Sequence, residues 1–325
     1  MNLYQNIEAF IAHHALIKCD TKIIVGLSGG PDSVFLLYFL VSLRNKYSLT
    51  FIAAHLNHEW RPESDQEQEL CRNLAHKLAI PFITKKRSEF SIPFKQNGSQ
   101  EEYGRKLRRY FFEKVANEYN ANTIALAHHA QDQEETFFIR LIRGSSLSGL
   151  TGIKAKNGMY IRPLLEINKS EIVNWLHNND IIYAMDTSNE SLSYLRNRIR
   201  LTVLPALRSC DKRFETNFLT TLNRLKATEL FLEDLTKKTF EEISFIQDTH
   251  FYIHIPQFLA IDRLLQHRIV IHWFIIEHVP FSPSEAYLNE VIRFINNPHG
   301  GKHEIHTQWS LIKEQKTIVI SRNNI

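Results

Sequence analysis

At 325 residues and 38.1 kDa the chain exceeds one typical domain, and its 43% hydrophobic and 23% charged residues are typical of a globular protein with two cores. The formal charge of +4 permits an anionic partner without requiring one. Three scattered cysteines, no signal-peptide pattern and no uncharged apolar stretch near ~20 residues argue against a secreted, zinc-ribbon or membrane protein, so we expect a cytoplasmic one.

The most informative segment is residues 22–33, Lys-Ile-Ile-Val-Gly-Leu-Ser-Gly-Gly-Pro-Asp-Ser. Its β-branched run suits a buried parallel strand, and Pro31 fits the first position of a following helix. The glycine pair between them lets the backbone approach a ligand, with free N–H groups and the helix dipole directed at an anion. Serine hydroxyls can donate to phosphate oxygens, and an aspartate can hold Mg²⁺. The candidate phosphate-binding residues are therefore Ser28, Gly29, Gly30, Pro31, Asp32 and Ser33, with Asp32 as the metal ligand.

Strand-like and helix-like segments alternate in the first half of the chain. Further apolar runs lie at residues 50–55, 81–84 and 123–127. The alternation predicts an α/β fold with a parallel sheet covered by helices on both faces. Ligands of such sheets bind beyond the carboxyl ends of the strands. We therefore expect the segments that follow strands to converge, namely residues 28–33, 55–61 and 128–135.

Two of these segments carry further groups for chemistry. Asp132 and Glu135 lie three residues apart at the start of an expected helix, where two carboxylates could bind a metal, an ammonium group or a proton in transfer. The alternative is that they only stabilise the helix N-terminus. In the other segment His55 and His58 have metal-like spacing without a third ligand nearby. Contact of His58 or Arg61 with a nucleotide is the preferred interpretation, and a capped loop is the alternative.

Two groups of arginines are candidates for binding anions. Arg105 and Arg108 lie on one stripe of an expected helix and can bind phosphates or carboxylates, or simply form a solvated face. Residues 195–213 carry six basic residues against one acid, which predicts an anion-facing helix and linker. The sharpest candidates within this segment are Arg196, Asn197 and Arg200.

The basic segment also marks the expected domain boundary. Residues 1–208 are predicted to form the nucleotide-binding domain, and residues 209–325 a smaller, mainly helical domain. Periodic Phe, Leu and Ile residues indicate helices from 214 to about 297, and residues 303–320 alternate like strands.

Together these blocks resemble the N-type ATP pyrophosphatase superfamily and, within it, the tRNA(Ile)-lysidine synthetases. The motif from Ser28 to Ser33 is similar to the superfamily signature, which alone indicates cleavage of ATP to AMP and pyrophosphate. Family specificity comes from the order of further blocks. These are His55-x-Asn57-His58-x-x-Arg61, Glu101 to Arg109, His129 to Thr136, Leu141-Ile142-Arg143-Gly144, Gly149 to Ile153, Arg162-Pro163-Leu164-Leu165, Asp186-x-Ser188-Asn189 and Arg196-Asn197-x-Ile199-Arg200. Where the family usually reads Asp-Asp-Gln, this chain has Gln131-Asp132-Gln133.

The resemblance implies an ATP- and Mg²⁺-dependent ligase. It would adenylate the wobble cytidine of an isoleucine tRNA with anticodon CAU, and the amine of L-lysine would then displace AMP. Asp132 and Glu135 would bind lysine or magnesium, two roles that the sequence does not divide. The catalytic residues implied are Asp32, Asp132, Glu135 and Arg196, and the other substrate-binding residues are Arg105, Arg108, Asn189, Asn197 and Arg200. The second domain would bind tRNA, and a homodimer is one oligomeric state left open.

Three rival functions remain at this point. A tRNA sulfur-transfer enzyme would need paired cysteines, and an amide-forming synthetase would need an ammonia-generating partner. Neither feature is recognisable in the sequence. A protein that binds tRNA or nucleotide without catalysis is the third rival. Intact Asp32, Asp132 and Glu135 argue against it, and Gln131 is the residue in its favour.

Overall fold

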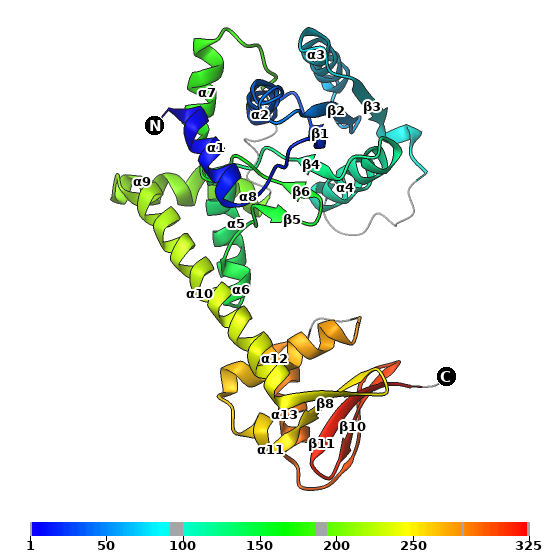
Figure 1. Cartoon of the computed structure of the whole chain (residues 1–325). Helices are drawn as coiled ribbons and strands as arrows, with labels where there is room; N and C mark the ends of the chain where they lie inside the picture. The colour runs from blue at the N-terminus through cyan, green and yellow to red at the C-terminus, as the bar shows by residue number, and fades with distance from the viewer. Residues whose placement is uncertain (1, 92–99, 186–193, 281–282, 324–325) are drawn as a thin grey trace. The chain divides into compact units, whose positions relative to one another are not determined.

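The computed structural model describes residues 2–91, 100–185, 194–280 and 283–323 (Figure 1). The chain divides into two compact units, Met1–Leu225 and Lys226–Ile325. The division falls inside a 30-residue helix, α10 (Phe214–Ile243), whereas the sequence places the domain boundary after residue 208. The segment between the two positions packs with the first unit.

A six-stranded sheet organises the first unit, in the order β3-β2-β1-β4-β6-β5 (Figure 1). Its strands are β1 (Lys22–Gly26), β2 (Thr50–Asn57), β3 (Phe82–Lys86), β4 (Thr123–Ala125), β5 (Lys156–Asn157) and β6 (Tyr160–Ile161). All neighbouring pairs are parallel except β5 with β6. The predicted parallel sheet is therefore confirmed, with a short antiparallel pair at one edge.

Alternate residues of β1 explain why helices cover both faces of this sheet. Ile23 and Val25 belong to a core with α2 (Pro31–Ser42) and α7 (Lys169–Asn178). Ile24 belongs to a second core with residues of α4 (Gln100–Glu118) such as Phe111. All four of these side chains are almost completely buried. The helices of the first unit are α1 (Leu3–His13), α2 (Pro31–Ser42), α3 (Ser64–Lys77), α4 (Gln100–Glu118), α5 (Ala130–Ile142), α6 (Leu147–Leu150), α7 (Lys169–Asn178), α8 (Leu195–Arg198) and α9 (Leu204–Cys210), with a 3-10 turn at Arg87–Glu89 and a π-helical turn at Ile199–Val203.

The second unit combines helices with an antiparallel sheet in the order β7-β8-β11-β10-β9. Trp273, Phe258 and Leu311 are buried in its core. Its elements after α10 are β7 (Ser244–Gln247), β8 (His250–His254), α11 (Ile255–Leu259), α12 (Arg263–Ile276), α13 (Glu285–Asn296), β9 (Gly301–His306), β10 (Trp309–Glu314) and β11 (Thr317–Arg322). No described helix is long and apolar enough to cross a bilayer.

The hairpin of β7 and β8 lies where the sequence predicted continued helix, so that local expectation was wrong. The two strands have four and five residues. β8 pairs with β11, more than sixty residues later in the chain. A partner so distant leaves no local periodicity, so short strands of this kind are not separable from the end of a helix by pattern alone.

Core packing of α2 against α7 gives a stability prediction. The Phe35 side chain is fully buried, and its ring lies 5.2 Å from the ring of Trp175 on α7, edge to face. Phe35→Ala should destabilise the first unit by about 3–5 kcal/mol because a large cavity forms in a packed core. Urea unfolding followed by circular dichroism measures the change. Ile142→Ala is the control, because Ile142 is 61% exposed and should alter stability by no more than about 0.5 kcal/mol.

Candidate active site

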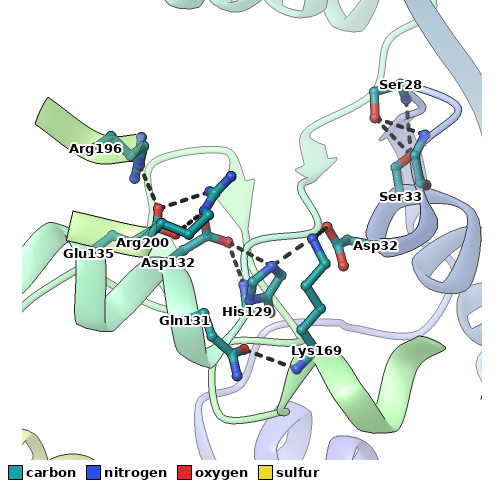
Figure 2. Close-up of polar contacts among 11 residues, drawn as sticks. Ser28, Asp32, Ser33, His129, Gln131, Asp132, Glu135, Lys169, Arg196 and Arg200 are labelled. Atoms are coloured by element: carbon teal, nitrogen blue, oxygen red, sulfur yellow. Dashed lines mark hydrogen bonds and ion pairs between the residues drawn. The ribbon is translucent and has the colours of Figure 1, made fainter. Parts of the chain in front are cut away.

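The glycine turn between β1 and α2 is closed by its own serines. The Ser33 hydroxyl accepts from the Ser28 N–H at 3.1 Å and donates to the Gly30 carbonyl at 3.0 Å. The two hydroxyls lie 3.0 Å apart (Figure 2). Gly29 has a φ of +86°, and a Cβ there would lie 3.3 Å from the Cys71 sulfur, so glycine is required at this position. No side chain caps the start of α2, so its first N–H groups are directed at whatever lies beyond the turn.

His129 connects this turn to the end of β4. Its Nε2 atom lies 3.5 Å from Asp32 Oδ2 and 3.6 Å from Asp132 Oδ2 (Figure 2). Asp132 also accepts the His129 backbone N–H at 2.9 Å and thereby caps the start of α5. The ammonium of Lys169 lies 3.6 Å from the same Asp32 oxygen. Two loops about a hundred residues apart in the sequence, together with the start of α7, thus place two carboxylates and two basic groups together.

The electrostatics favour a protonated imidazole between the carboxylates. Burial alone would lower the pKa of His129, but the negative charges of Asp132 and Asp32 outweigh it, and the net pKa is raised. Burial alone would raise the pKa of Asp132, but the neighbouring histidines and the hydrogen bond from His129 lower it overall. By contrast, burial lowers the pKa of His128 to about 4, so His128 is neutral.

The carboxylates fit a magnesium ion. Asp32 Oδ1 is buried and accepts no hydrogen bond from the described residues, which leaves that oxygen available to a cation. Asp132 lies across His129 from it. The described residues contain no cluster of three or more histidine, cysteine or acidic side chains able to enclose a metal. Mg²⁺ characteristically binds through one or two carboxylates, phosphate oxygens and water, so this donor set suits it.

Glu135 points elsewhere, toward the arginine-rich segment. Its side chain is fully buried and accepts from Arg196 Nε at 2.8 Å and from Arg200 through two nitrogens at 2.5 and 3.0 Å (Figure 2). The sequence expected Asp132 and Glu135 to share one helix face, yet the structure gives them separate partners. Glu135 therefore positions two arginines, since both of its oxygens are engaged.

A second buried carboxylate on α5 holds the same segment. Glu134 is 1% exposed and accepts from Arg208 at 2.5 Å, and Arg208 also contacts Glu215 at 2.7 Å. Burial raises the pKa of Glu134 to about 7, and Arg208 offsets part of that rise. The arginines that suggested an anion-facing surface thus include three that pair with buried acids of this chain. Sequence reasoning missed Glu134 because adjacent acids on a helix are usually solvated.

The end of β2 contacts the chain just before the glycine turn. His55 is buried, and its Nδ1 lies 2.9 Å from the Leu27 carbonyl, just before the turn. The His58 ring stacks on Trp60 at 4.4 Å, and burial, aided by the charge of Arg108, lowers the pKa of His58 to about 3. Arg61 pairs with Glu67 at 2.8 Å. The segments following β1, β2 and β4 therefore meet at one edge of the sheet, as predicted.

The remaining predicted site residues lie around this centre or outside the description. Arg105 and Arg108 are exposed on α4, and Asn197 is buried on α8. Their neighbour Arg109 pairs with Glu113 at 2.8 Å. Asn189 lies outside the described residues.

Two further residues belong to the site. The sequence motifs did not single out the first, and the second was noted only because it stands where the family usually has aspartate. Lys169 is one, through its contact with Asp32. Gln131 is the other, because its side-chain oxygen accepts the Lys169 backbone N–H at 2.9 Å. No spacing pattern could have joined them, since they are 38 residues apart and meet only through tertiary packing.

Comparison with known proteins now places the chain in a family. A model of the PP-loop domain matches residues 2–207. The tRNA(Ile)-lysidine synthase of Persephonella marina is 31% identical over 314 residues, which cover 96% of this chain and 68% of that relative. The chain belongs to the PP-loop family and, within it, to the tRNA(Ile)-lysidine synthases.

Further comparisons agree on this family and on the fold. The tRNA(Ile)-lysidine synthase of Bacillus cereus (strain ATCC 10987 / NRS 248) is 32% identical over 89% of this chain, which spans 63% of that relative's length. The relative from Clostridium perfringens is 39% identical over 70% of the chain and 50% of its own length. The solved structure of the U34-tRNA thiolase NcsA from Methanococcus maripaludis matches with a TM-score of 0.58 over 68% of this chain and 77% of that one. At 16% identity this last likeness concerns the fold alone.

The raised pKa of His129 predicts a pH dependence of stability. A histidine with a raised folded pKa contributes stability that is full below its ordinary pKa of about 6.5 and is lost as pH rises through the folded value. The difference in unfolding free energy between wild type and His129→Gln should therefore be largest near pH 6 and shrink toward pH 9. Urea titrations at several pH values measure it. His58 and His128 have lowered pKa values, so their contributions to stability change with pH in the opposite direction. Both residues are present in wild type and variant, so their contributions cancel in the difference, which then reports His129.

The Glu135 cluster predicts a large cost for removing its carboxylate. Glu135→Ala leaves two half-buried guanidinium groups without their central acceptor and should destabilise the first unit by about 3 kcal/mol. Glu69→Ala is a matched control, because Glu69 is exposed and pairs with exposed Arg72, a contact worth less than about 1 kcal/mol. Equal urea midpoints for the two variants would contradict the role assigned to Glu135.

Proposed function

We propose that the chain is a cytoplasmic tRNA(Ile)-lysidine synthase. It would use ATP to ligate free L-lysine to C2 of the wobble cytidine in an isoleucine tRNA with anticodon CAU, releasing AMP and pyrophosphate. The modified base would pair with A instead of G, so that the tRNA reads AUA. The observation that carries the proposal is the match to curated relatives over nearly the whole chain. It is supported by a glycine turn whose aspartate contacts the same histidine as a second carboxylate.

In the first step, the cytidine O2 oxygen would attack the α-phosphorus of ATP. The bond from that phosphorus to the bridging oxygen breaks, and pyrophosphate leaves with the electron pair. The N–H groups and serine hydroxyls from Ser28 to Ser33 would hold the phosphates. Asp32, with Asp132 nearby, would hold Mg²⁺, which supplies charge neutralisation when bound. His58 and Arg61 would line the nucleotide site from the β2 side.

In the second step, the ε-amine of lysine would attack C2 and expel AMP. Free lysine has a pKa of about 10.4, so the amine must lose a proton before or during the attack. Asp132, a carboxylate with a lowered pKa, would hold the ammonium group of lysine. His129 is already protonated, so the proton that lysine loses would pass to water. The lysine-binding role is therefore assigned to Asp132 rather than Glu135, whose oxygens are taken by arginines.

Arg196 and Arg200 would act from the Glu135 cluster. Their guanidinium groups are about one-third exposed while Glu135 fixes their orientation. A guanidinium has donors on several edges, so one edge can pair with Glu135 while another contacts RNA phosphate. Asn197, which is buried and lies between them in the sequence, would fix their orientation. The exposed Arg105 and Arg108 would contact the anticodon arm. The second unit would bind the body of the tRNA.

Sulfur transfer is not favoured by the cysteines. Cys71 is buried beneath the glycine turn, and burial raises its pKa to about 12, so it is not a nucleophile. Cys19 and Cys210 are exposed and unpaired. The cysteines thus offer neither a catalytic pair nor a cluster site.

The direct test is incubation with ATP, Mg²⁺, labelled lysine and tRNA bearing the CAU anticodon. Nuclease digestion and mass analysis should reveal a cytidine that has gained lysine with loss of water. An isoleucine tRNA with another anticodon is the control substrate. Release of pyrophosphate without lysine in the nucleoside would contradict the proposed nucleophile, and absence of both products would leave a binding protein.

The shared site predicts the effect of two substitutions on that assay. Asp32→Ala should lower product formation by at least about 100-fold because the metal and phosphate charges lose their ligand. Asp132→Ala should also lower product formation strongly, and it should reduce incorporation of lysine into the nucleoside more than it reduces release of pyrophosphate. Unchanged activity of Asp132→Ala alongside an inactive Asp32→Ala would rule out a site shared by the two carboxylates.

A further inference from the structure

A lysine that belongs to none of the sequence motifs lies at the glycine turn. The Lys169 ammonium is 3.6 Å from Asp32 Oδ2 and comes from the first residue of α7 (Figure 2). Among the described residues, Asp32 has two basic neighbours, Lys169 and His129. His129 is buried and also faces Asp132, whereas the Lys169 side chain is 45% exposed. Lys169 is therefore the cation at this turn that can move toward a ligand.

The backbone of Lys169 is fixed by α5. The Gln131 side-chain oxygen accepts the Lys169 N–H at 2.9 Å, which satisfies one of the donors at the start of α7. The Ala130 N–H, one residue earlier on α5, donates to the Ile167 carbonyl at 3.0 Å. Two hydrogen bonds thus tie the entry of α7 to the helix that carries Asp132.

Packing fixes α7 against α2 as well. Ile172 and Leu176 are fully buried in the core that contains α2, and Trp175 lies edge to face on Phe35. Since α2 begins at the glycine turn, the distance between Lys169 and the turn is set by a packed helix pair. Such a pre-positioned charge needs little reorganisation when a ligand arrives.

The ion pair with Asp32 does not by itself account for this arrangement. A half-exposed pair at 3.6 Å contributes at most about 1 kcal/mol to stability. If Asp32 binds a cation through Oδ1, that positive charge weakens the attraction between the carboxylate and Lys169, and the half-exposed ammonium can then turn to the anionic ligand of the cation. An ammonium group beside a phosphate-binding turn is suited to donate to the non-bridging oxygens of a phosphate group, which carry its negative charge.

We propose that Lys169 binds the β- and γ-phosphates of ATP and stabilises departing pyrophosphate, with Gln131 as its positioning residue. The inference rests on the proposed function and deepens it. As the bond between the α-phosphorus and the bridging oxygen breaks, negative charge grows on the leaving pyrophosphate, and the ammonium donates to it. Gln131, which occupies the position of the family's usual aspartate, contributes through the backbone of Lys169 and not through a charge.

The test compares Lys169→Gln with Lys169→Arg and with a matched surface lysine. Calorimetric titration with Mg²⁺ and inorganic pyrophosphate should give at least about 10-fold weaker binding for Lys169→Gln, and Lys169→Arg should recover most of the affinity. Lys77→Gln should bind as wild type, because Lys77 is exposed at the far end of α3. In turnover assays, Lys169→Gln should raise KM for ATP and lower the rate of AMP formation without changing KM for lysine.

Gln131 is tested by a pair of variants. Gln131→Ala should weaken pyrophosphate binding by a few-fold, and Gln131→Glu, which keeps an acceptor at the same reach, should restore it. Thermal unfolding midpoints of both variants report whether a loss merely reflects instability. If both variants lose the same pyrophosphate affinity while their thermal midpoints are unchanged, Gln131 does not position Lys169 through this hydrogen bond.

The outcomes separate this inference from the proposed function. Wild-type pyrophosphate affinity in Lys169→Gln would overturn the inference even if lysine ligation is found. If wild type forms no modified nucleoside but Lys169→Gln loses pyrophosphate affinity, the proposed function fails while the phosphate site stands. A wild-type protein that does not bind pyrophosphate with Mg²⁺ would overturn the inference.

Discussion

The contact of His129 with two aspartates is the interaction on which the rest of the site depends. Asp32 starts α2 and Asp132 caps α5, so the imidazole joins the loops after β1 and β4. Burial alone would raise the pKa of Asp132, and the positive charge of His129 helps to lower it overall. The imidazole therefore offsets the negative charge that the loops after β1 and β4 bring together.

Buried acids of α5 organise the second part of the site. Glu134 and Glu135 are both nearly inaccessible and hold arginines from the segment after residue 195. Burial of a carboxylate is unfavourable unless the carboxylate is paired. The ion pairs with these two acids therefore hold the segment against α5. The same pairing leaves part of each guanidinium exposed. Helix α5 therefore presents Asp132 to His129 in its first turn and anchors cationic side chains through the two acids that follow.

The sequence predicted those features of the fold and site that depend on short local patterns of residues. The run before Ser28 predicted a buried strand, Pro31 predicted the helix start, and the parallel sheet brought the three polar segments to one edge. Partners were harder to predict because pairing is a tertiary property. Arg196 and Arg200 have the same spacing whether they face RNA or Glu135, and Gln131 gains its role only by meeting Lys169 from a distant helix.

The central claim is that one site first activates the RNA with ATP and then presents it to lysine. It is tested most directly by trapping the intermediate. Incubation with ATP labelled at the α-phosphate, Mg²⁺ and tRNA bearing the CAU anticodon, without lysine, should place label on the tRNA. Addition of unlabelled lysine should then release that label as AMP at the rate of overall turnover. Absence of label on the tRNA, or labelled tRNA that persists after lysine is added, would contradict the account.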